Sequence, residues 1–175
     1  SGYFDTQVLL NLIVFGACFF LLGLLDDIYN FSPFIRLFVQ IIITSLLTLQ
    51  NFKIDAIYFS FLGVENGLIN IPNWLSFLII IFWVVGIVNA INWMDGLDGL
   101  AAGIILIAAI GFFIISLILN QFELSMISIF VIGICAAFLK FNSYPASILM
   151  GDSGSNLLGF IVAFMAYLSW YTDPI

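Results

Sequence analysis

Six long stretches without a charged side chain divide this 175-residue sequence, and they contain between 16 and 29 residues each. A helix crosses the hydrocarbon core of a membrane, about 30 Å thick, in roughly 20 residues. Fewer suffice where long flanking side chains reach back to the interface. We therefore predict an all-α polytopic membrane protein with about six transmembrane helices, at residues 6–25, 37–52, 74–92, 99–122, 124–139 and 153–172.

The composition excludes a water-soluble domain, because 64% of the residues are hydrophobic and only 7% are charged. The sequence has no histidine, which removes imidazole bases, Ser-His-Asp triads and the usual zinc sites from this chain. Cys18 and Cys135 both fall inside predicted spans without metal-ligand spacing, so we interpret them as packing residues. We expect the lipid bilayer as a partner and no nucleic acid.

Alternating spans predict that three polar clusters share one face of the membrane. The first span ends at Asp26-Asp27, the third delivers residues 89–98, and the fifth leads into the loop at residues 141–156. Arg36 and Lys140 lie on this face against Lys53 on the other, which favours a cytoplasmic orientation for the clusters. On the opposite face, β-forming residues flank Asn66-Gly67, so we expect a small β-hairpin with a type I′ turn there.

The polar face collects five carboxylates against two basic side chains. Such carboxylates repel one another unless a cation is present, and oxygen ligands suit Mg²⁺, with Mn²⁺ as the alternative. Magnesium commonly bridges to phosphate oxygens, which indicates metal-assisted phosphoryl transfer. If the fourth helix begins near Asp95, Asp98 lies on the same face. The helix N-termini near Leu97 and at residues 151–155 are then a predicted diphosphate cradle.

Each polar residue also has a purely structural interpretation. Asp152 fits the N-cap of a helix, and Asp26-Asp27 fits a solvated helix end. Arg36 fits an interface anchor, while Asn89 and Asn92 fit interhelical hydrogen bonds. All of these would have to coincide on one face by accident, which favours the functional interpretation.

Three ordered segments carry a family resemblance: "GLLDDIYNFSPFIR", "NAINWMDGLDGLAAG" and "FLKFNSYPASILMGDSGSNLLGF". They resemble the signatures of the polyprenyl-phosphate N-acetylhexosamine-1-phosphate transferases of glycosyltransferase family 4. That family includes the undecaprenyl-phosphate N-acetylglucosamine-1-phosphate transferases and the phospho-N-acetylmuramoyl-pentapeptide transferases. The resemblance implies that a polyprenyl phosphate attacks the β-phosphorus of a UDP-N-acetylhexosamine and releases UMP, with Mg²⁺ as cofactor, at the cytoplasmic face of a bacterial inner membrane.

The resemblance also implies roles for individual residues. Asp27 and Asp152 are the expected metal ligands. The expected catalytic residues are Asp26, Asp27, Asp95 and Asp98. The expected substrate-binding residues are Arg36, Asn89, Asn92 and Asn142. Where the family commonly has Phe three residues before the metal-binding Asp, this sequence has Leu149, so we expect altered recognition of the uracil base.

The whole sequence reads as one membrane domain, residues 1–175, and we expect it to be an internal portion of a larger transferase. The His-rich cytoplasmic loop of the family is missing from these residues. A homodimer through the helices is compatible with the sequence. Two alternatives stay open: a non-catalytic membrane partner that retains the fold, and an ion or proton transporter. The transporter is disfavoured because the carboxylates lie at span ends on one face.

Overall fold

The structure is a computed structural model that describes residues 6–50, 52–58 and 68–170. Its elements follow in the order α1 (Thr6–Tyr29), α2 (Pro33–Thr48), β1 (Ala56–Tyr58), β2 (Leu68–Asn70), α3 (Asn73–Met94), α4 (Leu100–Leu119), α5 (Phe122–Asn142) and α6 (Gly151–Trp170). Apart from the two short strands, the described chain is a bundle of helices.

Five of the described helices, all except α2, are long and apolar enough to cross a membrane. This confirms an integral membrane protein with five of the six predicted spans. The short span predicted at residues 37–52 corresponds to α2, an apolar helix of 16 residues, and its crossing of the membrane stays a prediction. It begins earlier than predicted, since the Ser32 side chain caps it and Pro33 occupies its first turn.

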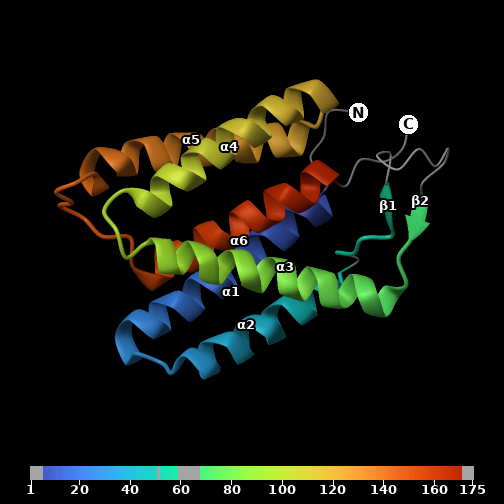
Figure 1. The fold of residues 1–175 in the computed structure, drawn as a ribbon, viewed down its shortest axis with the longest axis horizontal. Coiled ribbons are helices and arrows are strands. Elements are labelled where there is room, and N and C mark those ends of the chain that lie inside the picture. The colour runs from blue at the N-terminus through green and yellow to red at the C-terminus, as the bar shows by residue number, and fades with distance from the viewer. Residues whose placement is uncertain (1–5, 51, 59–67, 171–175) are drawn as a thin grey trace.

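Helix α6 occupies the middle of the bundle and packs closely against α1 and α3 (Figure 1). Helices α4 and α5 form an antiparallel pair that packs on α6 from the other side. Aromatic rings fill the contact between α1 and α6, where Phe19 and Phe160 stack with their ring centroids 5.0 Å apart. Both rings are fully buried, so this contact anchors the first helix against the last.

Helices α1 and α6 approach each other most closely at Gly23. A Cβ atom at this position would lie 2.2 Å from the carbonyl oxygen of Asp152, well inside van der Waals contact. Gly159 has a similar role against α3, where a Cβ would lie 2.8 Å from the Cα of Val88. These two glycines therefore set how closely α6 approaches its neighbours.

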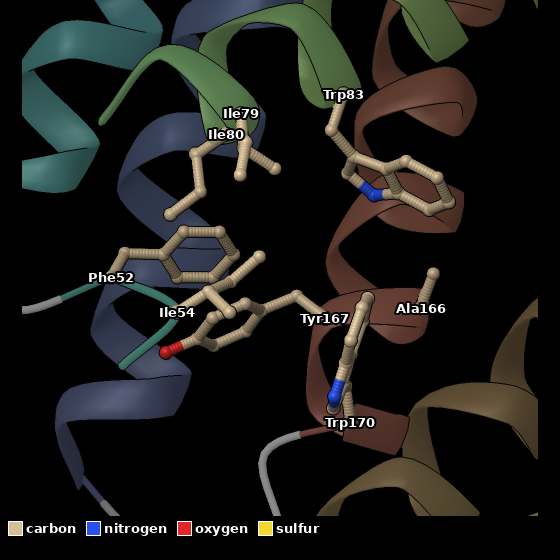
Figure 2. A pocket seen from close by; sticks show the side chains of 8 residues that line it. All are labelled: Phe52, Ile54, Ile79, Ile80, Trp83, Ala166, Tyr167 and Trp170. Atoms are coloured by element: carbon tan, nitrogen blue, oxygen red, sulfur yellow. The ribbon is translucent and has the colours of Figure 1, made fainter. Parts of the chain in front are cut away.

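At the end of the bundle where α3 begins, β1 and β2 pair antiparallel with Ala56 opposite Asn70. Their connection, residues 59–67, lies outside the described residues, so the Asn66-Gly67 hairpin turn stays a prediction. Next to this end is an apolar pocket between α3, α6 and the segment before β1 (Figure 2). The ring of Tyr167 stacks on Phe52, and its hydroxyl donates to the carbonyl of Lys53 over 3.3 Å.

Candidate active site

The three predicted polar clusters meet at one end of the bundle, opposite the β strands. The connections α1–α2, α3–α4 and α5–α6 all lie at that end in Figure 1. Side chains at the ends of α1, α2 and α3 reach Asp152 at the start of α6. We name Asp26, Asp27, Asp95 and Asp152 the acidic cluster. The predicted convergence of polar residues on one face is confirmed.

Asp27, at the end of α1, caps helix α6. Its carboxylate accepts hydrogen bonds from the backbone N–H groups of Asp152 at 2.8 Å and Ser153 at 3.0 Å. A carboxylate at a helix N-terminus is stabilised by both these donors and the helix dipole. The cap therefore comes from a residue 125 positions away, and these two N–H groups already have an internal partner.

Arg36, in the first turn of α2, joins two members of the acidic cluster. Its Nη1 lies 2.7 Å from Asp26 Oδ2 and 3.4 Å from Asp152 Oδ2. Asp26 is only 3% exposed and also accepts the backbone N–H of Phe31 at 2.8 Å. Such a buried carboxylate requires this kind of compensation, so Arg36 links α1, α2 and α6.

Asn92, near the end of α3, ties that helix to α6. Its side-chain amide donates to Asp152 Oδ1 and, over 2.9 Å, to the hydroxyl of Ser155. Both carboxylate oxygens of Asp152 thus have partners, one on α3 and one on α2. The structure places Asn92 in contact with the acidic cluster.

Asp95 follows α3 directly and is half-buried. Burial raises the pKa of its carboxyl, and the neighbouring Asp152 and Asp27 carboxylates raise it further, against a hydrogen bond from the backbone of Gly151. The condition for Asp95 and Asp98 to share a helix face, a start of α4 near Asp95, is not met. Gly99 has φ of 72°, which interrupts the helix, and α4 begins at Leu100. Asp95 and Asp98 are therefore not on one helix face.

Asp98 and Asn142 brace the loop between α5 and α6. Asp98 is exposed and accepts the backbone N–H of Ala146 at 2.9 Å. Asn142 is 3% exposed, accepts the N–H of Gly99 at 3.1 Å and donates to the carbonyl of Ile148 at 2.9 Å. In these contacts both side chains hold the loops beside the acidic cluster, and their predicted catalytic and substrate-binding roles stay predictions.

Asn89 is directed deeper into the bundle. Its side-chain amide donates to Gln40 Oε1 at 2.6 Å and to the Val85 carbonyl at 2.8 Å. Gln40 in turn donates to Asn156 Oδ1 at 2.9 Å, and both of these residues are fully buried. Sequence reasoning missed Gln40 and Asn156, although each follows a predicted site residue, Arg36 or Asp152, by four positions.

The carboxylate oxygens of the acidic cluster are ligands that suit a hard divalent cation shared with a substrate. Among the described residues, no three of the His, Cys, Asp or Glu side chains gather as a group able to hold a metal. Magnesium, however, is usually bound by one or two carboxylates plus substrate phosphates rather than by a closed protein cage. The Asp27 carboxylate accepts the backbone N–H of Asp152. A cation would relieve the like-charge repulsion that Asp27 and Asp152 exert on Asp95.

The fold and this polar end define a membrane-embedded helix bundle with a cluster of carboxylates at one end. Residues 9–170 match the glycosyl transferase family 4 profile, which covers most of the chain, so the protein belongs to that family.

Relatives within the family have related names. The chain is 33% identical over 172 residues to a probable undecaprenyl-phosphate N-acetylglucosaminyl 1-phosphate transferase of Bacillus subtilis (strain 168), a match that covers 98% of this chain and 47% of that protein. It is 39% identical over 182 residues to a phospho-N-acetylmuramoyl-pentapeptide-transferase of Prochlorococcus marinus, over 92% of this chain and 47% of the relative. It is 36% identical over 170 residues to a decaprenyl-phosphate N-acetylglucosaminephosphotransferase of Mycobacterium leprae, over 93% of this chain and 42% of the relative. The chain spans about half the length of these curated relatives.

Proposed function

We propose that the protein containing this chain transfers N-acetylhexosamine 1-phosphate from a UDP-sugar to a polyprenyl phosphate. A phosphate oxygen of the lipid forms a bond to the β-phosphorus of the UDP-sugar. The bridging bond between that phosphorus and the α-phosphate oxygen breaks, and UMP leaves with the electron pair. The products are UMP and a polyprenyl-diphosphate-linked sugar.

One observation carries this proposal: the acidic cluster and Arg36 meet at a single end of an apolar helix bundle that belongs to a sugar-phosphate transferase family. Carboxylates and a guanidinium at a membrane edge suit a reaction between a lipid phosphate and a water-soluble nucleotide sugar. The names of the relatives support the polyprenyl phosphate and the transfer of an N-acetylglucosamine phosphate.

Arg36 is the residue we assign to phosphate binding. Both of its carboxylate contacts use Nη1, and a guanidinium carries five N–H donors, so donors remain for a phosphate oxygen. Positive charge fixed in this position neutralises the phosphates as the two substrates approach. The remaining catalytic task is positioning, because a phosphate nucleophile needs little activation.

Asp27 and Asp152 are the residues we assign to magnesium, since they are adjacent and belong to two different helices. When bound, the ion would neutralise diphosphate charge and stabilise the leaving UMP. Asp95 completes the acidic cluster with a carboxyl that faces both of them. Burial is the main cause of its raised pKa, and the charges of Asp152 and Asp27 add to it; a cation here would relieve that part of the shift.

We assign the acidic cluster to the cytoplasmic face of a bacterial inner membrane, where the UDP-sugar is available. Arg36 and Lys140 lie at this end and Lys53 at the other, in the sense of the positive-inside rule. The exposed Leu149, 72% accessible, precedes the acidic end of α6 and is the position we assign to contact with the uracil ring.

The test is a transfer assay with the longest chain that contains residues 1–175, in detergent or nanodiscs with polyprenyl phosphate. Several UDP-sugars, including UDP-N-acetylglucosamine, are offered with and without Mg²⁺, and both UMP and the lipid-linked product are measured. We expect stoichiometric formation of both products, dependent on Mg²⁺. A folded protein that releases no UMP from any UDP-sugar would contradict the proposal and favour a non-catalytic membrane partner, while Asp-dependent ion flux into vesicles would favour a transporter.

A further inference from the structure

Three helices each place one residue in contact at the polar end and a second residue one turn deeper. On α2 the two are Arg36 and Gln40, on α3 they are Asn92 and Asn89, and on α6 they are Asp152 and Asn156. Residues three or four apart lie on the same face of a helix. The deeper members form a second layer, the amide triad of Gln40, Asn89 and Asn156, directly beneath the contacts that join Arg36, Asn92 and Asp152.

Hydrogen bonds run through the amide triad without interruption. Asn89 donates to Gln40 Oε1 at 2.6 Å, and Gln40 donates to Asn156 Oδ1 at 2.9 Å. Asn156 then donates to the backbone carbonyl of Asp152 at 2.7 Å. The triad therefore connects α3 to α2 and α2 to α6. Within α6, Asn156 is bonded to Asp152, the residue whose carboxylate meets Arg36.

Burial makes this arrangement selective for one register of the three helices. Gln40 and Asn156 are fully buried in an apolar bundle, where an amide without a partner carries a large desolvation cost. A shift of α6 by one residue against α2 would separate the two amides and leave both unsatisfied. The triad thus favours the single register in which Arg36 Nη1 and Asp152 face each other.

We propose that Gln40 and Asn156 are positioning residues for the transferase reaction, which fix α2 against α6 so that Arg36 and Asp152 meet the substrates in the correct geometry. The expected effect on kcat rests on the proposed function. The fixed position of α2 against α6 does not. Neither residue lies in the acidic cluster, so the effect of changing them passes through Arg36 and Asp152.

The kinetic test compares Gln40→Asn, Asn156→Gln and the double variant that exchanges the two side-chain lengths. Each single variant changes the combined length of the two side chains that join α2 to α6, whereas the double variant restores that combined length. We expect each single variant to lower kcat on the order of 10- to 100-fold with a smaller change in KM for the UDP-sugar, because small displacements of reacting groups have effects of this size. The double variant is expected to recover most of the lost kcat.

Thr44→Val is the matched control. Thr44 is as fully buried as Gln40 and lies one turn further along α2, where its hydroxyl donates to the Gln40 carbonyl within the same helix. This variant removes one buried hydrogen bond from α2 but no side chain of the amide triad. It is expected to keep kcat within about threefold, because all three side chains of the amide triad stay in place. Equal losses in Thr44→Val and Gln40→Asn would overturn the positioning role.

A second readout needs no activity. Spin labels at the exposed Phe34, in the first turn of α2, and at Leu149, just before α6, report the separation of the two helix ends in a background without Cys18 and Cys135. We expect one narrow distance distribution, broadened or shifted by Gln40→Met and unchanged by Thr44→Val. An unchanged distribution in Gln40→Met would overturn the inference. If the parent protein lacks transferase activity, the proposed function fails while this measurement still decides the role of the amide triad.

Discussion

Adding a single methyl group at Gly23 tests whether the close contact of α1 and α6 sets the geometry of the acidic cluster. In Gly23→Ala the new Cβ would lie 2.2 Å from the Asp152 carbonyl oxygen and 2.6 Å from the Ser153 Cα. Both are backbone atoms of the turn whose N–H groups bind Asp27, so no flexible side chain can move aside.

The size of the effect follows from these distances. Ordinary van der Waals contact begins at 3.4 Å, so the start of α6 must move by about 1.2 Å relative to α1. Overpacking of this kind costs about 1–3 kcal/mol of folding free energy. A displacement of about 1 Å in an active site lowers the rate on the order of 100-fold.

The assay measures UMP release and the midpoint of thermal unfolding for Gly23→Ala beside Gly86→Ala. Gly86 is a matched control within α3, because a Cβ there would meet nothing within 4 Å. In that open position alanine is expected to stabilise the helix by about 0.5–1 kcal/mol relative to glycine. If Gly23→Ala keeps a rate within threefold of Gly86→Ala, the contact between α1 and α6 does not set the site geometry.

Two further substitutions test the electrostatics of the acidic cluster. Arg36→Met leaves Asp26, 3% exposed, without its guanidinium partner, and we expect a loss of about 3 kcal/mol in the free energy of unfolding, partly recovered by Asp26→Asn in the same chain. Burial holds the pKa of Asp95 above its ordinary value of about 3.9, so its carboxyl favours folding when protonated and loses that contribution as the pH rises through the raised pKa. Asp95→Asn is therefore expected to unfold at a higher temperature than the unmodified protein at pH 7, with a smaller difference at pH 4; an equal difference at both pH values would contradict this.

The sequence predicts the arrangement of the membrane helices well because uncharged length is a strong physical signal. Because successive spans run in opposite directions, three distant polar segments are predicted to lie at one end even when the packing of the helices is not known. The span predicted at residues 99–122 agrees with the start of α4 at Leu100, but the turn that keeps Asp95 and Asp98 off one helix face could not be predicted in the same way. Gly99 has a positive φ, and its N–H donates to Asn142 at the end of α5, a contact that sequence spacing does not show.

Individual contacts within the site depend on tertiary packing. Nothing local indicates that Asp27 caps a helix 125 residues later, because that cap requires the close approach at Gly23. Gln40 and Asn156 were missed for a different reason. An uncharged amide within an apolar span has no charge to mark it, and its link to the site shows only in the spacing of four residues from Arg36 or Asp152.

The most direct test of the central claim compares Asp152→Asn with Asp55→Asn in the Mg²⁺-dependent transfer assay. Both exchange one carboxylate for an amide, but Asp55 is exposed at the opposite end of the bundle, where it pairs with Lys53 over 2.9 Å. The account predicts that Asp152→Asn loses at least about 100-fold in UMP release while Asp55→Asn stays near the unmodified rate. Equal rates in the two variants would contradict the assignment of the acidic cluster as the active site.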